Sequence, residues 1–187
     1  MSDIVGPCLN DPFPPLETAR LLLRCVALKD AAETSSLMTS EVSRWLASWP
    51  FPFTKAMAEN HIQGMRTAAV QATALPYAIL LKEGRKLAGW VILTKEALDL
   101  RRGALSYWLG QPYHGRGFAR EAITAVLSTG FEQLDLAVIE AGAQPGNVGS
   151  LAVMRTCGMA EAGERMVYAP ARGREELCIF YEISRSA

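Results

Sequence analysis

The chain has 187 residues, half of them hydrophobic, which suits one domain with a sizeable core. Lys plus Arg and Asp plus Glu both number 19, and this balance gives no support to a nucleic-acid-binding protein, which usually carries a basic excess. No apolar run reaches the roughly 20 residues of a membrane span, and the N-terminus lacks a basic region followed by an apolar core. We therefore expect neither a membrane segment nor a secretory signal.

The four cysteines are scattered along the chain. Cys8, Cys25, Cys157 and Cys178 form no CxxC pair and have no histidine near them. This argues against a zinc site and against a disulfide scaffold. We expect free thiols, no bound metal and a cytoplasmic protein.

The first part of the chain reads as an N-terminal arm followed by a strand and helices. Residues 1–15 are rich in proline and polar side chains and are predicted to form the arm, and a single domain is expected over 16–187. Thr54 stands where the longest of the helices should begin, and its hydroxyl is predicted to cap that helix. The predicted elements are a strand over 20–28, short helices over 29–40 and 40–49, and a helix over 55–72.

The rest of the chain alternates strands and helices. The turn "KEGRK" is predicted to join two strands of a hairpin, and "HGRGFA" precedes a helix with an apolar stripe. In chain order the sequence predicts strands over 77–81, 87–94 and 103–110, a helix over 118–131, a strand over 134–143, a helix over 150–156, and strands over 162–170 and 175–183. This order predicts one α+β domain of α/β three-layer type, with a mixed, mostly antiparallel sheet of about seven strands and helices on both faces.

Gly115, Arg116 and Gly117 stand at the entrance of the predicted helix over 118–131. The first N–H groups of a helix have no internal partner and the helix dipole is positive there, so a phosphate or pyrophosphate is the natural ligand. Glycines allow close backbone approach, and Arg116 adds positive charge. The stretch is neither a Walker loop nor a Rossmann fingerprint, because no GK[ST] follows and Arg120 takes the third glycine position. An ordinary glycine turn is the alternative.

A second motif, "NVGSLAVMRTCGM" over 147–159, follows about thirty residues later. The order of strand, "HGRGFA", helix, strand and "NxxSxxVxxxxGM" resembles the GNAT superfamily of N-acetyltransferases. "ETARLLLR" and "YWLGQPYHGRGFAREA" resemble its RimJ/RimL-like branch of ribosomal-protein-alanine N-acetyltransferases. The resemblance extends over about residues 16–183 and implies the GNAT-like fold, in which two parallel strands splay apart.

The resemblance also implies that acetyl-CoA binds as cosubstrate where these strands splay. Trp108, Leu109 and Gly110 would offer backbone groups to the pantetheine arm, and the N–H of Leu109 would stabilise the oxyanion that develops on the thioester. Asn147 would hydrogen-bond the pantetheine arm, and Ser150 would lie near the thiol. The pyrophosphate would be held by His114, Gly115, Arg116, Gly117, Phe118 and Ala119.

The sequence departs from the family at the positions that usually move protons. Many relatives carry a Glu where Ala104 stands in "GALSYW", and others carry a Tyr where Met154 stands. Ser150 is left as a catalytic partner of the departing thiolate, with helix capping as the alternative. His114 replaces the Gln or Arg that often opens the loop, and we expect it to face solvent or phosphate rather than act as a base.

An aromatic cluster falls within "RWLASWPFPF". In related folds this region forms one wall of the acceptor cleft, so Trp45, Trp49 and Phe51 are predicted to bind the acceptor. Such a wall suits an apolar or aromatic amine, or the end of a peptide. Core packing of at least two of these rings, counting Phe53, is the alternative.

Two classes of function follow. The first is an enzyme that transfers an acetyl group from acetyl-CoA to a primary amine of a protein N-terminus or small molecule, by direct attack in a ternary complex. The second is an acyl-CoA-binding sensor or partner protein with weak or lost catalysis, which the missing Glu favours. The acceptor stays open among protein N-termini, aminoglycoside-like amines, polyamines and amino acids. A homodimer stays open as well, because dimers are frequent in the family.

Overall fold

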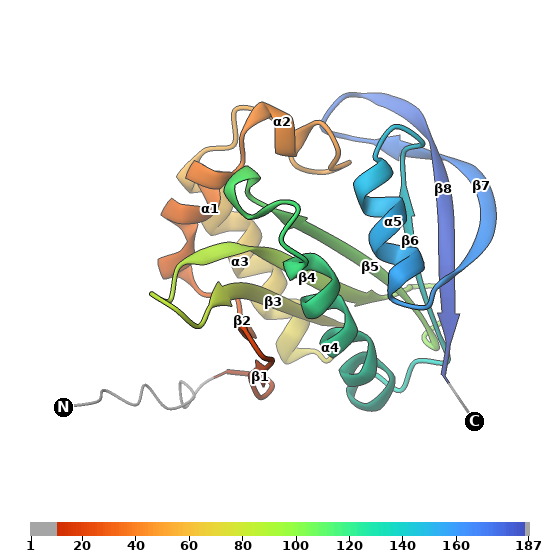
Figure 1. Cartoon of the computed structure of the whole chain (residues 1–187), viewed down its shortest axis with the longest axis horizontal. Helices are drawn as coiled ribbons and strands as arrows, with labels where there is room; N and C mark the ends of the chain where they lie inside the picture. The colour runs from red at the N-terminus through yellow and green to blue at the C-terminus, as the bar shows by residue number, and fades with distance from the viewer. Residues whose placement is uncertain (1–10, 186–187) are drawn as a thin grey trace.

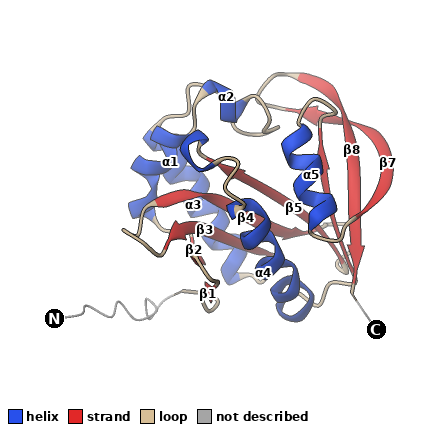
Figure 2. Ribbon diagram, in the orientation of Figure 1, coloured by secondary structure: helices blue, strands red, loops and turns tan. Residues whose placement is uncertain are grey.

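The computed structural model describes residues 11–185, and Figures 1 and 2 show one sheet with helices packed on it. Most of the predicted arm over 1–15 lies outside the described residues. The helices are α1 (Ala31–Leu37), α2 (Ser40–Ser43), α3 (Lys55–Val70), α4 (Phe118–Gln133) and α5 (Val148–Thr156), with 3-10 helices η1 (Leu28–Asp30) and η2 (Gln111–Tyr113). The strands are β1 (Leu16–Glu17), β2 (Leu21–Cys25), β3 (Ala74–Leu81), β4 (Leu87–Lys95), β5 (Arg102–Leu109), β6 (Val138–Ala143), β7 (Ala160–Ala169) and β8 (Arg174–Ser184).

The strands of the described chain form a single sheet in the order β1-β2-β3-β4-β5-β6-β8-β7. Neighbouring strands are antiparallel except β5 and β6, which run parallel. The predicted mixed, mostly antiparallel sheet is therefore confirmed. The additional strand is β1, whose two residues are too few to produce a recognisable hydrophobic alternation.

The parallel strands are paired only near their beginnings. The register joins residues 102–104 of β5 to residues 138–140 of β6, and no pairing of these strands continues toward Leu109 in the described chain. β4, in contrast, stays paired with β5 as far as Leu109. The two parallel strands thus splay apart, as the GNAT resemblance implies, while β5 remains fixed to the rest of the sheet.

Helices cover both faces of the sheet, with α4 and α5 on one face and α1, α2 and α3 on the other (Figure 1). Side chains alternate along a strand, so neighbouring residues of β5 enter different cores. Leu105 and Leu109 pack with the apolar stripe of α4, whereas Trp108 packs with α1 and α3. β3 and β4 are buried along almost their whole length because helices cover them on both sides.

The connection between α2 and α3 shows where local signals are right and where tertiary contacts decide. Thr54 caps α3 as predicted, because its hydroxyl accepts the Met57 N–H at 3.2 Å. The helix predicted over 40–49 is too long, since α2 ends at Ser43. The Ser43 hydroxyl donates to the Trp49 carbonyl at 2.6 Å, and this bond folds the segment back so that Trp49 enters the core.

Candidate active site

The splay exposes the backbone edge of β5. The Gly110 N–H donates to the Ala88 carbonyl of β4 at 2.9 Å. Backbone groups alternate in direction along an antiparallel pair, so Trp108 also faces β4 and the Leu109 N–H points to the side from which β6 has diverged. Gly89 supports this orientation, because a Cβ at that position would collide with the Trp108 carbonyl oxygen. The Leu109 N–H is thus accessible to a ligand in the splay. The expectation that Trp108 and Gly110 offer backbone groups to the pantetheine arm is therefore corrected, because β4 and the Tyr113 N–H engage those groups.

The loop between β5 and α4 has a backbone that requires glycine. Gly115 has φ of 68° and Gly117 has φ of 77°, in the left-handed region where a Cβ is unfavourable. Gly117 is the N-cap of α4 and offers no side-chain acceptor to the first N–H groups of the helix. These N–H groups are left for an anion, and the space beside Gly115 is open, since a Cβ there would meet nothing within 4 Å.

Arg20, in the turn between β1 and β2, holds this loop from outside. One terminal nitrogen donates to the Arg116 carbonyl at 2.9 Å, and Nε donates to the Glu121 carboxylate at 2.7 Å. The guanidinium carbons of Arg20 and Arg116 lie 4.6 and 4.8 Å from the centre of the Phe118 ring. Burial raises the pKa of Glu121, but hydrogen bonds from Thr18 and Arg20 outweigh burial, and the net pKa lies below its ordinary value. The "ETARLLLR" motif therefore contributes the anchor of the glycine loop.

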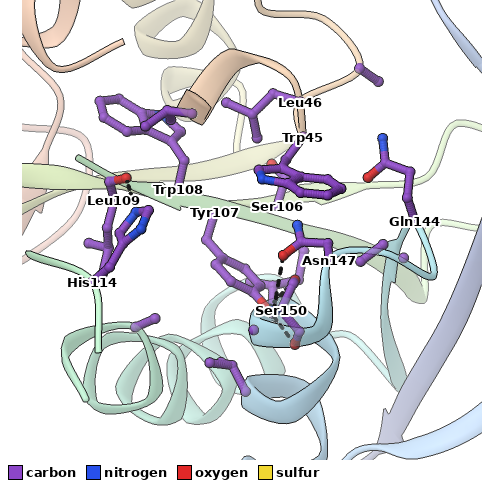
Figure 3. Close-up of a pocket in the computed structure, with 18 of the residues that line it drawn as sticks. Trp45, Leu46, Ser106, Tyr107, Trp108, Leu109, His114, Gln144, Asn147 and Ser150 are labelled. Carbon is purple, nitrogen blue, oxygen red and sulfur yellow. Dashed lines mark hydrogen bonds between the residues drawn. The ribbon is translucent and has the colours of Figure 1, made fainter. Parts of the chain in front are cut away.

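The second motif places a hydroxyl pair at the start of α5 (Figure 3). The Asn147 side chain caps the helix by accepting the Ser150 N–H at 3.2 Å. The Ser150 hydroxyl lies 2.7 Å from the Tyr107 hydroxyl, which also lies within hydrogen-bond reach of the Ser150 carbonyl, 3.1 Å away. Burial raises the pKa of Tyr107 to about 12, partly offset by the Ser150 hydrogen bond, so its hydroxyl keeps its proton near neutrality. From sequence Tyr107 belongs to the strand expected to meet the pantetheine arm, and its side chain is expected to pack in the core, so its contact with Ser150 was not predicted. Its position two residues before Leu109 on the same face of β5 is the signal that could have indicated this contact.

A cavity of about 600 Å³ joins the splay, the glycine loop and the start of α5. The predicted cofactor-binding residues that line it are Trp108, Leu109, His114, Gly115, Gly117, Phe118, Ala119, Asn147 and Ser150. Gly110 and Arg116 do not belong to the lining. Gly110 packs against Leu37, whose Cδ2 would be 2.6 Å from a Cβ at Gly110, and Arg116 contributes its carbonyl to Arg20.

His114 ties the glycine loop to β5. Its Nε2 lies 2.7 Å from the Leu109 carbonyl, and because a carbonyl can only accept, this ring nitrogen carries the proton. The bond occupies one ring nitrogen and fixes the imidazole beside the end of β5 (Figure 3). This contact gives His114 a structural task at the cofactor end of the cavity.

The positions that carry proton-transfer groups in many relatives do not reach the cavity. Ala104 is exposed on the face of α1, α2 and α3 and lies outside the lining. The β5 residues that line the cavity on that face are Ser106 and Trp108. Met154 is fully buried in the core and is also outside the lining.

The far end of the cavity is bounded by the segment after α2 and by β7 and β8. Trp45 lines it, and its ring edge lies 3.5 Å from where a Cβ of Gly146 would be (Figure 3). The expectation that Trp49 and Phe51 join this wall is corrected by the structure. Trp49 is 6% exposed and packs against Trp90, with ring centres 5.3 Å apart, because the Ser43 bond draws it inward. Phe51 is 59% exposed and lies outside the lining.

Glu176 on β8 lines the same end. The sequence favours a solvated turn at Glu175 and Glu176, with a carboxylate that faces the acceptor as the alternative. Its carboxylate accepts hydrogen bonds from Arg172 at 2.6 and 2.8 Å, from Gln144 at 2.9 Å and from Arg174 at 2.9 Å. The Arg172 hydrogen bond is the main cause of a pKa lowered to about 2. Every second side chain of a strand lies on the same face. This period of two is the signal that places Glu176, Cys178 and Phe180 of β8 together in the lining.

Cys178 brings a thiol to the cavity, which sequence reasoning did not foresee. Burial raises the pKa of this thiol above its ordinary value, so it stays protonated and is a weak nucleophile. The described cysteines, Cys25, Cys157 and Cys178, are all free. Within residues 11–185, no group of three His, Cys, Asp or Glu side chains is placed to hold a metal ion, and no helix is long and apolar enough to cross a membrane.

The splayed strands, the glycine loop at α4 and the hydroxyl pair at α5 together define an acetyltransferase of the acetyl-CoA-dependent kind. Residues 20–160 match the family model described as Acetyltransferase (GNAT) domain, and the chain belongs to this family. The protein is thus an N-acetyltransferase with acetyl-CoA as cosubstrate, and the prediction of fold, activity and cosubstrate is confirmed.

Comparison with individual proteins agrees with this assignment. The chain is 29% identical over 160 residues to the uncharacterized N-acetyltransferase p20 of Bacillus licheniformis. The matched region covers 85% of this chain and 89% of p20. Its fold is similar to that of RimJ from Mycobacterium smegmatis in complex with CoA-disulfide, with a TM-score of 0.78, 23% identity and coverage of 91% and 86% of the two chains. The ribosomal-protein-S5-alanine acetyltransferase from Vibrio fischeri gives a TM-score of 0.80, 20% identity and coverage of 92% and 97%.

Proposed function

We propose that the protein acetylates a primary amine by direct transfer within a complex that holds acetyl-CoA and the acceptor together. The observation that carries this proposal is the splay of β5 from β6 directly beside the left-handed glycine loop. An uncapped helix N-terminus suits the pyrophosphate, and the open edge of β5 suits the pantetheine arm. The buried, protonated Cys178 favours direct attack over an acetyl-cysteine intermediate.

Leu109 and Asn147 are proposed to position the acetyl donor. The Leu109 N–H faces the open side of β5, where it can donate to the thioester oxygen as negative charge develops there. Asn147 caps α5 through its side-chain oxygen, and its amide nitrogen remains a donor for the pantetheine arm. The neutral amine nitrogen forms the new N–C bond, and the C–S bond of the thioester breaks. The nitrogen loses one proton and the departing CoA sulfur gains one, so that the products are the amide and the CoA thiol.

Ser150 is proposed to hydrogen-bond the departing sulfur, with Tyr107 as the residue that positions it. The Tyr107 hydroxyl has one proton and two acceptors on Ser150, the hydroxyl at 2.7 Å and the carbonyl at 3.1 Å. Donation across the shorter contact is the arrangement proposed here, because it directs the Ser150 proton toward the cavity. A hydrogen bond from serine lowers the energy of a thiolate without a full proton transfer. The amine must arrive neutral, and because Ala104 and Met154 provide no base, solvent water takes its proton.

The test uses the purified protein, acetyl-CoA and a panel of primary amines, with CoA release followed by a thiol reagent. Ser150→Ala is expected to lower kcat by about tenfold to a hundredfold, while the Kd for CoA measured by calorimetry stays within about twofold. Tyr107→Phe is expected to lower kcat about tenfold, since it removes only the positioning bond. Unchanged kcat in Ser150→Ala would remove Ser150 from the reaction. CoA binding without acetylation of any amine would favour a CoA-binding sensor instead.

The compartment and the acceptor are also part of the proposal. Free thiols at Cys25, Cys157 and Cys178 support a reducing compartment, and we assign the protein to the cytoplasm. Similarity to proteins named as ribosomal-protein acetyltransferases supports a protein N-terminus as acceptor, with a small amine as the alternative. The homodimer stays a prediction, and sedimentation of the purified protein tests it.

A further inference from the structure

The end of the cavity away from the glycine loop, here called the acceptor end, is walled by apolar side chains. It lies where the segment after α2 approaches β7 and β8, and Trp45 forms one side of it (Figure 3). Its apolar lining includes Val42, Trp45, Leu46, Val167, Cys178 and Phe180, and Ser106 and Gln144 add two uncharged polar side chains. When an acceptor binds here, the substituent attached to its amino group packs against these side chains. Burial of that substituent contributes binding free energy in proportion to its apolar area.

Glu176 is the one acidic residue in the lining formed by residues 11–185, and its oxygens are fully engaged. Oε1 accepts from Arg172 and Arg174, and Oε2 accepts from Arg172 and Gln144. A carboxylate offers about four lone-pair positions, so these four bonds use its acceptor capacity. The two guanidinium groups also neutralise its charge. Glu176 therefore offers no vacant site to an ammonium group of the acceptor.

On the opposite wall, Arg44 stacks on Trp45 outside the lining and pairs with Glu41 at 3.4 Å, so the described part of this wall offers no unengaged carboxylate to the cavity. The guanidinium carbon of Arg44 lies 4.8 Å from the centre of the Trp45 ring. Every side-chain nitrogen of Arg172 is engaged, because its remaining terminal nitrogen donates to the Leu46 carbonyl at 3.0 Å. This bond also joins the β7–β8 turn to the segment after α2, and the Ala171 N–H adds a second bond between them to the Ala47 carbonyl at 2.9 Å. A second cationic group on the acceptor would enter a largely apolar space whose carboxylate is already engaged, so it would have no free anionic partner among the described residues there.

We propose that the acceptor is a primary monoamine whose amino group is attached to an apolar or aromatic group, and that polyamines and aminoglycosides are poor acceptors. This inference rests on the proposed function and names its substrate class. The chemistry is shared by arylalkyl amines and by peptides with an apolar N-terminal residue. Both present one amino group, which reacts in its neutral form, beside a side chain that fits the wall of Trp45 and Phe180.

The experiment compares two acceptors that differ only at the far end. Hexylamine and 1,6-diaminohexane have the same chain length, and their kcat/KM values are corrected for the neutral fraction of the amine at each pH. Hexylamine is expected to be at least about tenfold better, because the second ammonium of the diamine finds no unengaged carboxylate in the described lining of the acceptor end. 2-Phenylethylamine and a phenylalanyl-glycine amide then distinguish a small-molecule amine from a peptide N-terminus by which has the higher kcat/KM.

A matched pair of variants tests the charge argument directly. Val167 lines the acceptor end and is half-buried on β7. The preference is the ratio of kcat/KM for hexylamine to kcat/KM for 1,6-diaminohexane. Val167→Asp adds an unengaged carboxylate and is expected to reduce this ratio at least about threefold. Val167→Asn has the same size as Val167→Asp but no charge, and it is expected to leave the ratio within about twofold of the wild type. If either variant fails to fold by circular dichroism, Ala47→Asp and Ala47→Asn replace the pair, since Ala47 also lines the cavity.

The outcomes separate the proposed acetylation of amines from the proposed preference for a monoamine. An equal or higher kcat/KM for the diamine in the wild type would overturn the monoamine assignment and leave amine acetylation intact. The same effect of Val167→Asp and Val167→Asn would show that packing rather than charge sets the preference, and would overturn the charge argument. Acetylation of no amine at all, with CoA still bound, would overturn the proposed function together with this inference.

Discussion

Replacing Arg20 with alanine should weaken CoA binding although Arg20 does not line the cavity. Its side chain holds the glycine loop through the Arg116 carbonyl at 2.9 Å and holds the first turn of α4 through Glu121 at 2.7 Å. Without these bonds the loop must be ordered by the ligand itself, and that ordering reduces the observed affinity.

The magnitude follows from exposure. A hydrogen bond to a charged group contributes about 1.5–3 kcal/mol when well buried, and an exposed ion pair contributes about 0.2–1 kcal/mol. The Arg20 side chain is 49% exposed. We therefore expect a loss of about 1 kcal/mol, which is roughly a fivefold increase in the Kd for CoA.

The assay is titration calorimetry with CoA on the wild type, Arg20→Ala, Arg20→Lys and the control Arg185→Ala. Arg185 pairs with Asp135 at 3.5 Å and is 47% exposed, so the control removes an arginine of similar exposure whose ion pair does not contact the loop. Arg20→Lys keeps the charge but loses the paired donors, and it is expected to lie near Arg20→Ala. Full affinity in Arg20→Lys would refute the anchoring argument, because it would reduce the role of Arg20 to general positive charge.

Four further predictions concern the whole site. Saturating acetyl-CoA, at about 100 times its Kd, should stabilise the fold by ~2.7 kcal/mol, visible as a rise in melting temperature; no rise would contradict cosubstrate binding. Gly117→Glu should abolish CoA binding in calorimetry while circular dichroism stays native-like, because it adds bulk and negative charge at a left-handed position; unchanged affinity would show that the loop is not the phosphate site. Glu176, with its pKa lowered to about 2 from 4.5, stabilises the fold above about pH 4.5 and loses this contribution as pH falls through 2. Glu176→Gln should therefore cost about 1 kcal/mol in urea unfolding at pH 7, after allowance for solvent screening, and the difference should vanish near pH 2; a constant difference would contradict it. The kcat/KM should rise with pH along the titration of the acceptor amine, because Glu176 stays ionised and Tyr107, with its pKa near 12, stays protonated; a limb near pH 6–7 that vanishes in His114→Ala would make His114 the base.

Much of the fold could be predicted from sequence because its signals are local. The left-handed turns at 115 and 117 fall on glycines, and Thr54 marks the start of α3. The cap of α5 is Asn147 and not Ser150, which is the residue that the sequence suggests as a helix cap. The cofactor end of the cavity follows from the same motifs, since those residues are adjacent in sequence and β5 leads directly into α4.

The acceptor end could not be predicted in the same way, because it is assembled from segments far apart in the chain. Trp45 and Trp49 are chemically alike and four residues apart, yet one lines the cavity and the other is buried. The difference arises from the Ser43 bond to the Trp49 carbonyl, a tertiary detail with no sequence pattern. Glu176 likewise reads as a solvated turn residue until the β7–β8 turn meets the segment after α2.

β5 links the two ends of the cavity, and its alternation separates their chemistry. Tyr107 and Leu109 project to the face of α4 and α5, where they meet Ser150 and the glycine loop. Ser106 and Trp108 project to the opposite face and line the cavity beside the segment after α2. A substitution at an odd position of this strand should therefore act mainly on the reaction of acetyl-CoA, and one at an even position mainly on the choice of acceptor. Because the N–H of Leu109 is a backbone group, side-chain variation at Ser106 can alter acceptor selectivity while the proposed oxyanion contact is preserved.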